Sequence, residues 1–334
     1  MKKYFRFWAK TALVLVYLVI FAGAVVRMTG SGMGCPDWPK CFGYYIPPTQ
    51  ESDLIFKPNT LYNKGQAIIS NETLMVAKAD FKSDSSYNST NWEKYTKHDY
   101  AIFNVYHTWV EYINRLLGAL AGLACVITFI ISFSYWNTNK LFVALAFGIC
   151  ILMGFQAWLG KTVVDSVLNP YKISLHMLVA LLIVALQLFL IFKSKTLKIN
   201  YTSNLTKLLL VVLTLTVVQI VLGTNVRQYI DEIAHTGLPK LFWLQSPKWT
   251  FYVHRSFSII VLITNAYLFY SNRKQSVSNK KLNWMGAIIL LEILSGIVMT
   301  YVHFPFGSQT LHLVLASLLF GVQFYVLLET KKTI

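Results

Sequence analysis

The chain has 334 residues, of which 55% are hydrophobic and 13% charged, about half the charged fraction of a soluble domain. This composition argues against a soluble enzyme, a disordered chain or a fibrous protein, and the length accommodates about eight membrane-spanning helices plus loops. Lys and Arg outnumber Asp and Glu by 30 to 14, and the net charge of +16 indicates either nucleic acid or an anionic membrane as a partner until the charges are placed along the chain.

Apolar runs predict an all-α integral membrane protein with eight transmembrane helices. Most runs reach the roughly 18 residues needed to cross hydrocarbon. Runs such as 208–215 are apolar on every face, and no alternating barrel pattern is present. In chain order the predicted helices are 12–29, 104–132, 141–163, 171–192, 207–225, 251–271, 283–304 and 309–328.

The positive charges predict the orientation of these helices, because cytoplasmic segments are rich in Lys and Arg. A cytoplasmic N-terminus puts many of them in short inner segments and leaves both termini inside, which the even number of helices allows. Membrane lipid then accounts for the charge without nucleic acid, and a bacterial inner (plasma) membrane is the predicted location. The inner residues are Lys2, Lys3, Arg6, Lys10, Lys140, Lys193, Lys195, Lys198, Lys207, Arg273, Lys274, Lys280, Lys281, Lys331 and Lys332.

The first predicted helix is followed by a long outer loop, about 30–103. Ala22–Ala24 also resembles a signal-peptide cleavage site, although the repeat described below includes this helix and favours its retention. Cys35 and Cys41 lie just beyond the helix, on the oxidising side, where a disulfide is reasonable. Such a tight disulfide is either a structural clip or an accessible redox pair. The rest of the loop is polar and shows no motif, and we expect it to cap a site or to contact a partner.

The chain repeats itself in two four-helix halves, 1–200 and 201–334, which predicts two pseudo-symmetric bundles. A bundle core is a natural cofactor site. Short segments correspond in the same order in both halves: Gly23–Arg27 with Gly223–Arg227, Asn114-Arg115 with His254-Arg255, and Leu175-His176 with Leu311-His312. Gln156, Gln219 and Glu292 each stand four residues before a glycine, namely Gly160, Gly223 and Gly296.

Five of the seven histidines fall at the outer ends of predicted helices: His107, His176, His254, His303 and His312. Histidines on facing helices are a usual way to hold haem iron. His254 and His312 are the predicted pair of one haem, and His176 with a partner in the second helix is the other. Hydrogen-bonded interfacial histidines are the alternative, and zinc is the competing metal, although the sequence indicates no Cys or carboxylate paired with these histidines.

Five charged residues lie at the same outer level. Arg27, Arg115, Arg227 and Arg255 are candidates to bind haem propionates, with interfacial snorkelling as the alternative. Glu111 is a candidate acid/base group, and a buried pair with Arg115 is its alternative. We interpret Glu292 as a packing or hydrogen-bonding group opposite Gly296.

Several segments resemble the haem A synthase family. The longest is Gly23-x-x-Val26-Arg27-x-Thr29-Gly30-Ser31-Gly32-x-Gly34-Cys35-Pro36-Asp37-Trp38-Pro39-x-Cys41-x-Gly43, which is similar to the N-terminal motif of that family. The segments Glu111–Arg115, Leu175-His176, His254-Arg255 and Gln309–His312 resemble its other helix motifs.

The resemblance implies a b-type haem in the C-terminal half, on His254 and His312. It implies that haem O binds in the N-terminal half, where its C8 methyl group is oxidised to a formyl group for cytochrome oxidase. Glu111 matches a glutamate for which a catalytic role is proposed, and Cys35 and Cys41 match a pair linked to electron transfer or haem delivery. Haem O synthase and the assembly of cytochrome oxidase are the implied partners, and homo-oligomers remain open.

The chain departs from the family at Asn114, which stands where the family usually has a histidine in the second helix. Asn is a poor iron ligand, so we expect either that His107, seven residues earlier on the same helical face, replaces it or that His176 binds haem O alone. The second function hypothesis is a b-type electron-transfer cytochrome, and the third is a non-enzymatic haem-binding protein of the membrane. The Cys-Pro-Asp-Trp-Pro segment and Glu111 favour the synthase.

Overall fold

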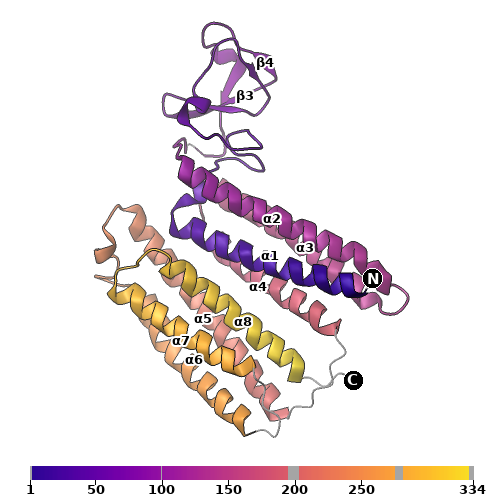
Figure 1. Ribbon diagram of the computed structural model, residues 1–334. Coiled ribbons are helices and arrows are strands. Elements are labelled where there is room, and N and C mark those ends of the chain that lie inside the picture. The colour runs from indigo at the N-terminus through magenta and orange to yellow at the C-terminus, as the bar shows by residue number, and fades with distance from the viewer. Residues whose placement is uncertain (1, 99, 195–202, 275–280, 331–334) are drawn as a thin grey trace.

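The computed structural model describes residues 2–98, 100–194, 203–274 and 281–330. Eight long helices dominate this part of the chain (Figure 1). They are α1 (Lys2–Met28), α2 (Val105–Ser132), α3 (Lys140–Asp165), α4 (Pro170–Lys193), α5 (Ser203–His235), α6 (Trp249–Arg273), α7 (Lys281–Tyr301) and α8 (Ser308–Thr330).

Seven of these helices are long and apolar enough to cross a membrane, so the chain is a multi-pass membrane protein. Only α6 falls outside this set, and it contains Arg255, Asn265, Asn272 and Arg273. Large apolar side chains nevertheless face outward on it, as on the other helices; Ile263 of α6 is 62% exposed and Ile130 of α2 is 61% exposed. Outward apolar side chains are the pattern of helices that face lipid.

Local sequence explains where several helices begin. The side chains of Asn104 and Asn139 accept hydrogen bonds from backbone N–H groups in the first turns of α2 and α3. Asn169 does the same for α4, whose first residue is Pro170. Both are strong helix-start signals, because they satisfy or remove N–H groups that have no partner within the helix.

Two helices extend well beyond their predicted ends. α1 begins at Lys2 rather than residue 12, and α5 continues to His235 rather than residue 225. The added turns of α5 hold an ion pair between Arg227 and Asp231, four residues apart, which stabilises a helix where apolar periodicity fades. The predicted boundary between the halves, 200/201, lies outside the described residues, as do Lys195, Lys198, Lys280, Lys331 and Lys332.

The helical fold class is confirmed, and the long outer loop, in which the sequence indicated no motif, contains five short strands. β1 (Leu61–Tyr62) pairs with β4 (Phe81–Lys82), and β3 (Thr73–Ala77) lies between β2 (Ala67–Ser70) and β5 (Trp92–Lys94), all antiparallel. Tyr62, Ile68, Ala77 and Trp92 form a buried core. We call residues 44–103 the β-domain. It projects beyond the helices, at the end of the bundle opposite to the two termini (Figure 1).

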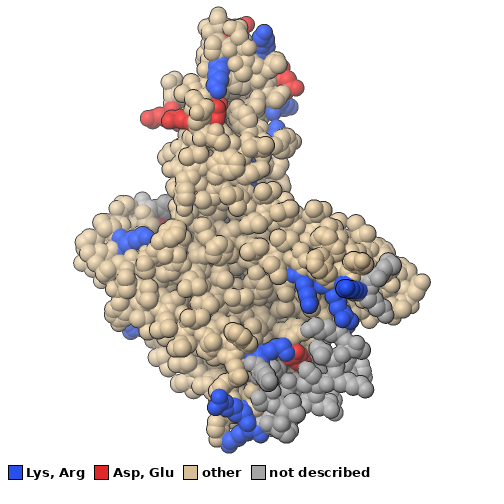
Figure 2. Space-filling view, in the orientation of Figure 1, with Lys and Arg blue, Asp and Glu red and all other residues tan. Residues whose placement is uncertain are grey.

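The two sets of four helices meet along α1, α4, α5 and α8, whose apolar side chains share one core. α1 approaches α8 closely at Gly321, where an added Cβ would lie 2.1 Å from Tyr17 Oη. Figure 2 shows charged side chains on the β-domain and at the end of the bundle near the termini, with few between them on this face. We call these ends of the bundle the β-domain end and the terminal end.

Candidate functional site

A glycine on each odd-numbered helix faces one particular side chain on the next helix. A Cβ added at Gly223 of α5 would lie 3.1 Å from Cε1 of His254 on α6, and one at Gly160 of α3 would lie 3.5 Å from Cε1 of His176 on α4. Gly296 of α7 faces His312 of α8 at 3.8 Å in the same way. A missing side chain at each glycine thus lets an imidazole lie against the neighbouring helix.

Asn114 occupies the fourth of these positions. A Cβ at Gly23 of α1 would lie 3.8 Å from Asn114 Oδ1 on α2. We call Asn114, His176, His254 and His312 the glycine-faced positions. All four lie in the part of the even-numbered helices nearer the β-domain end, since these helices begin there. The structure therefore places Asn114 at the position that three histidines occupy elsewhere.

The residue four positions before each glycine contacts the same partner in three of the four cases. Gln156 Nε2 donates a hydrogen bond to the backbone oxygen of His176 at 2.8 Å, and Gln219 Nε2 donates to that of His254 at 3.1 Å. Glu292 contacts the ring of His312 instead, at 2.8 Å. Val19 stands at the corresponding place in α1 and has no polar side chain.

His254 and His312 face each other with ring centroids 6.4 Å apart and ring planes at 74°. A metal ion bound between two imidazole nitrogens, with bonds of about 2 Å, separates the ring centroids by about 6 Å. The Nδ1 atom of His254 is buried without a hydrogen-bond partner among the described residues. This spacing and the two supporting glycines fit an iron atom held from both sides.

The pairing of Glu292 with His312 corrects one sequence-based expectation, that no carboxylate is paired with the histidines. Glu292 Oε2 lies 2.8 Å from His312 Nδ1, and Ser295 Oγ lies 2.8 Å from the same atom. Glu292 was interpreted as a packing or hydrogen-bonding group opposite Gly296. It lies on the same face of α7, one turn before Gly296, and its partner His312 was missed. The sequence could have indicated this pairing, because Glu292 stands where the two corresponding positions have glutamine.

The first half contains a single histidine at a glycine-faced position. His176 Nδ1 and Asn114 Oδ1 are both buried and have no hydrogen-bond partner in the described part of the chain. His107 lies in the first turn of α2, where its backbone N–H bonds to Asn104 and its ring contacts that of Tyr106. It stands seven residues, or about 10 Å along the helix axis, from Asn114.

Glu111 and Arg115 join α2 to the cysteine loop, residues 34–43. Glu111 is 4% exposed; its Oε1 accepts from Arg115 Nη2 at 2.6 Å and its Oε2 from the backbone N–H of Cys35 at 2.8 Å. Arg115 also donates to the backbone oxygens of Cys35, Asp37 and Lys40 at 2.7–2.9 Å. The buried pair considered as the alternative for Glu111 is thus present, and both residues anchor the cysteine loop.

Cys35 and Cys41 form a disulfide, and both residues are buried. The loop that they close packs against α2 so tightly that a Cβ at Gly34 would lie 2.3 Å from the backbone oxygen of His107. The carboxylate of Asp37 accepts from the N–H groups of Phe42 and Gly43, and burial raises its pKa above the ordinary value although these bonds oppose the shift. A buried disulfide in a tightly held loop favours the structural clip over the accessible redox pair.

The two corresponding arginines of the halves meet at one carboxylate. Arg27 and Arg227 each lie 2.7 Å from Asp231, and Arg227 Nη2 also donates to the backbone oxygen of Arg27 at 3.0 Å. Two guanidinium groups thus share one carboxylate and leave a local excess of positive charge. Arg255 is exposed and stacks on Phe251 and Tyr252.

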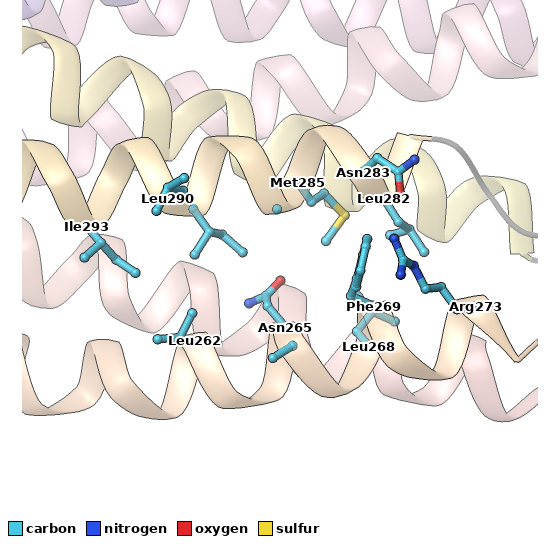
Figure 3. A pocket seen from close by; sticks show the side chains of 13 residues that line it. Leu262, Asn265, Leu268, Phe269, Arg273, Leu282, Asn283, Met285, Leu290 and Ile293 are labelled. Carbon is cyan, nitrogen blue, oxygen red and sulfur yellow. The ribbon is translucent and has the colours of Figure 1, made fainter.

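A cavity of about 540 Å³ lies between α6 and α7, toward the terminal end (Figure 3). Apolar side chains line most of it, Asn265 points into it, and Arg273 lies beside Asn283 at one end. None of its lining residues occupies a glycine-faced position. His303 does not occupy a glycine-faced position either; it is exposed in the turn after α7.

A family model and several curated relatives match most of this chain. The COX15-CtaA family, described as cytochrome oxidase assembly protein, matches residues 6–83 and 64–324. A haem A synthase of Wolbachia pipientis from Culex pipiens is 26% identical over 96% of this chain and 96% of its own length. One from Wolbachia pipientis wMel is 24% identical over 97% of this chain and 92% of its own length, and one from Shewanella oneidensis is 26% identical over 69% of this chain and 59% of its own.

Proposed function

Because the chain belongs to the COX15-CtaA family of cytochrome oxidase assembly proteins, we propose that it is a haem A synthase, a membrane oxidoreductase that converts haem O to haem A. Relatives that carry this name align with nearly the whole chain, β-domain included. The observation that carries the proposal is the set of glycine-faced positions, which offers one site with two histidines and another with one. Two such sites suit a resident haem and a substrate haem.

We assign the resident haem b to the C-terminal half. His254 and His312 would hold its iron from both sides, and this group supplies one-electron transfer when bound. With a histidine on each side, the protein would leave no open position on this iron for a reacting molecule. The C-terminal site is therefore the electron-transfer site of the pair, and Arg227 and Arg255 are its propionate candidates.

We assign the substrate haem O to the N-terminal half, with His176 as the histidine on its iron. Asn114 is a poor ligand, so the α2 side would leave room for a reacting molecule. Glu111, three residues before Asn114 on α2, is the proposed acid/base group, with Arg115 holding its Oε1. Arg27 and Arg115 are the propionate candidates of this half. His107 lies too far along α2 for the iron if Asn114 marks its level, so we assign it to the edge of the haem.

We extend the proposal to the whole molecule. Eight spans, α6 included, and a pseudo-twofold relation between α1–α4 and α5–α8 account for the paired positions of Gly23 with Gly223 and of Arg27 with Arg227. Both termini then lie in the cytoplasm of a bacterial cell, and the haem sites and the β-domain on the outer side of the inner membrane. Haem O synthase is the proposed source of the substrate, and cytochrome oxidase assembly its destination.

The test is the haem extracted from cells that coexpress this chain with a haem O producer. We expect haem A or its hydroxylated precursor to accumulate, and the variant His176→Ala to stop its formation while haem b remains bound. Bound haem b with only haem B and haem O in the extract would contradict the proposal and favour an electron-transfer cytochrome.

A further inference from the structure

Glu292 distinguishes His312 from the other histidines at the glycine-faced positions. Two oxygen atoms lie 2.8 Å from Nδ1 of His312, namely Glu292 Oε2 and Ser295 Oγ. An ionised carboxylate accepts and does not donate, so Nδ1 of His312 carries the proton and Nε2 remains available to a metal. The rings of His176 and His254 have no such partner on Nδ1 within the described ranges.

The corresponding positions show what Glu292 adds. Gln156 and Gln219 use their side-chain amides to bind the backbone oxygens of the histidines, which supports the helix but leaves the rings untouched. Glu292 sits at the same helix position, yet its carboxylate reaches the ring itself. Its side chain is 14% exposed, so water competes weakly for this contact. Glu292 thus differs from both glutamines in what its side chain contacts and not in its position on the helix.

We propose that Glu292 is a positioning residue of the C-terminal haem site, which fixes the ring of His312 and makes it the more electron-donating of the two axial ligands. The inference rests on the proposed binding of haem b by His254 and His312. A ligating histidine that donates its other N–H to a carboxylate is fixed in orientation and becomes more basic. A more basic ligand stabilises ferric over ferrous iron, so Glu292 lowers the reduction potential of the haem.

The test is a spectroelectrochemical titration of the haem b in the purified full-length protein, with the variant Glu292→Gln. Gln keeps the size of the side chain and is the residue at the two corresponding positions. We expect the variant to retain a six-coordinate low-spin haem whose midpoint potential is more positive, by about a tenfold change in the ferric/ferrous equilibrium or about 59 mV for one electron. Ser295→Ala should leave the carboxylate contact and shift the potential less.

Gln156→Leu is the matched control, because it changes the corresponding position of the other half and should leave the haem b potential unchanged. A Glu292→Gln protein that keeps its haem at the wild-type potential would overturn the inference, whatever its yield of haem A. If Glu292→Gln loses the haem, Glu292→Asp is the second test. Haem binding in Glu292→Asp supports the role of the carboxylate, whereas loss of haem in both variants overturns that role and indicates that Glu292 serves packing. If the wild-type protein binds no haem b, both the inference and the assignment of the resident haem are overturned. If Glu292→Gln shifts the potential as expected but the wild-type protein forms no haem A, only the synthase proposal is overturned.

Discussion

The two halves of the molecule share the glycine-faced arrangement but differ in the side chains that occupy it. In the C-terminal half both glycine-faced positions are histidines, their rings lie 6.4 Å apart, and one ring is fixed by a carboxylate. In the N-terminal half one of the two positions is Asn114, and the nearby carboxylate, Glu111, is bound to Arg115 and to the cysteine loop. The β-domain is also attached to this half alone.

Under the proposed function, this difference separates the roles of the two sites. A pair of ligands closes both faces of an iron atom and suits electron transfer, whereas a single ligand leaves one face for chemistry. The half with a single histidine at these positions is also the half that carries a buried acidic group, a cysteine loop and an extra domain. The predictions that follow are ordered by the size of their expected effects, and each one tests this contrast.

Removing one ligand of the C-terminal pair should have the largest effect. We expect His312→Ala or His254→Ala to abolish the low-spin haem b spectrum, because a haem with one remaining ligand loses its six-coordinate state. Absorbance spectra and the haem-to-protein ratio of the purified protein measure this. His303→Ala is the control, since His303 is exposed in a turn outside the glycine-faced positions; loss of haem b from this control would break the assignment of the pair.

The arginines that follow the glycine-faced positions on α2 and α6 should differ sharply in their importance for stability. Arg115 holds Glu111 and three backbone oxygens of the cysteine loop, so Arg115→Leu leaves a buried carboxylate unpaired and should lower the free energy of unfolding by about 3–5 kcal/mol. Arg255 instead stacks on two aromatic rings at the surface, so Arg255→Leu should cost about 1 kcal/mol or less.

Thermal unfolding in detergent and limited proteolysis of residues 30–103 measure this second contrast. We expect faster cleavage in Arg115→Leu because the cysteine loop loses its anchor to α2. Equal stability of the two variants would mean that the network around Glu111 contributes little to the free energy of unfolding. That result would support Glu111 as a free acid/base group.

Much of the helical fold was predictable from apolar periodicity. The predicted ranges 104–132, 171–192 and 309–328 differ by at most two residues from α2, α4 and α8. Periodicity failed where a helix is held by polar pairs, as in the extension of α5 at Arg227 and Asp231. The strands of the β-domain were missed because they are two to five residues long, too short for a period of two to stand out from a polar loop.

The residue types of the site and their order along the chain were predictable from the sequence, whereas the contacts between these residues were less so. The repeat aligned Asn114 with His254 and His176 with His312, and the glycine contacts are consistent with that alignment. Contacts between residues far apart in the chain, such as Arg115 with the cysteine loop or Arg27 with Asp231, depend on helix packing and loop path. No spacing rule along the sequence encodes them.

Restoring the fourth histidine should make the first half resemble the second. We expect Asn114→His to give the substrate haem a second ligand, to turn its spectrum low-spin and to lower the yield of haem A several-fold, since the open face is closed. His107→Ala should weaken haem O binding without removing it. Normal occupancy and an unchanged haem A yield in His107→Ala would remove His107 from the site, and an active Asn114→His would contradict the open-face assignment.

The smallest effects should come from adding one methyl group at the glycines. Comparing Gly296→Ala with Gly223→Ala tests whether these glycines make room for the histidine rings. Alanine in place of a helical glycine gains about 0.5–1 kcal/mol from backbone entropy, and at Gly296 the new Cβ would only touch His312 at 3.8 Å. Gly296→Ala should therefore be neutral or slightly stabilising.

At Gly223 the Cβ would lie 3.1 Å from His254, so the ring must shift by a few tenths of an ångström. We expect Gly223→Ala to keep its stability and yet lose haem b more readily in a competition assay with apomyoglobin, because the ring and not the fold absorbs the displacement. Equal haem retention in the two variants would show that the glycines serve helix packing alone.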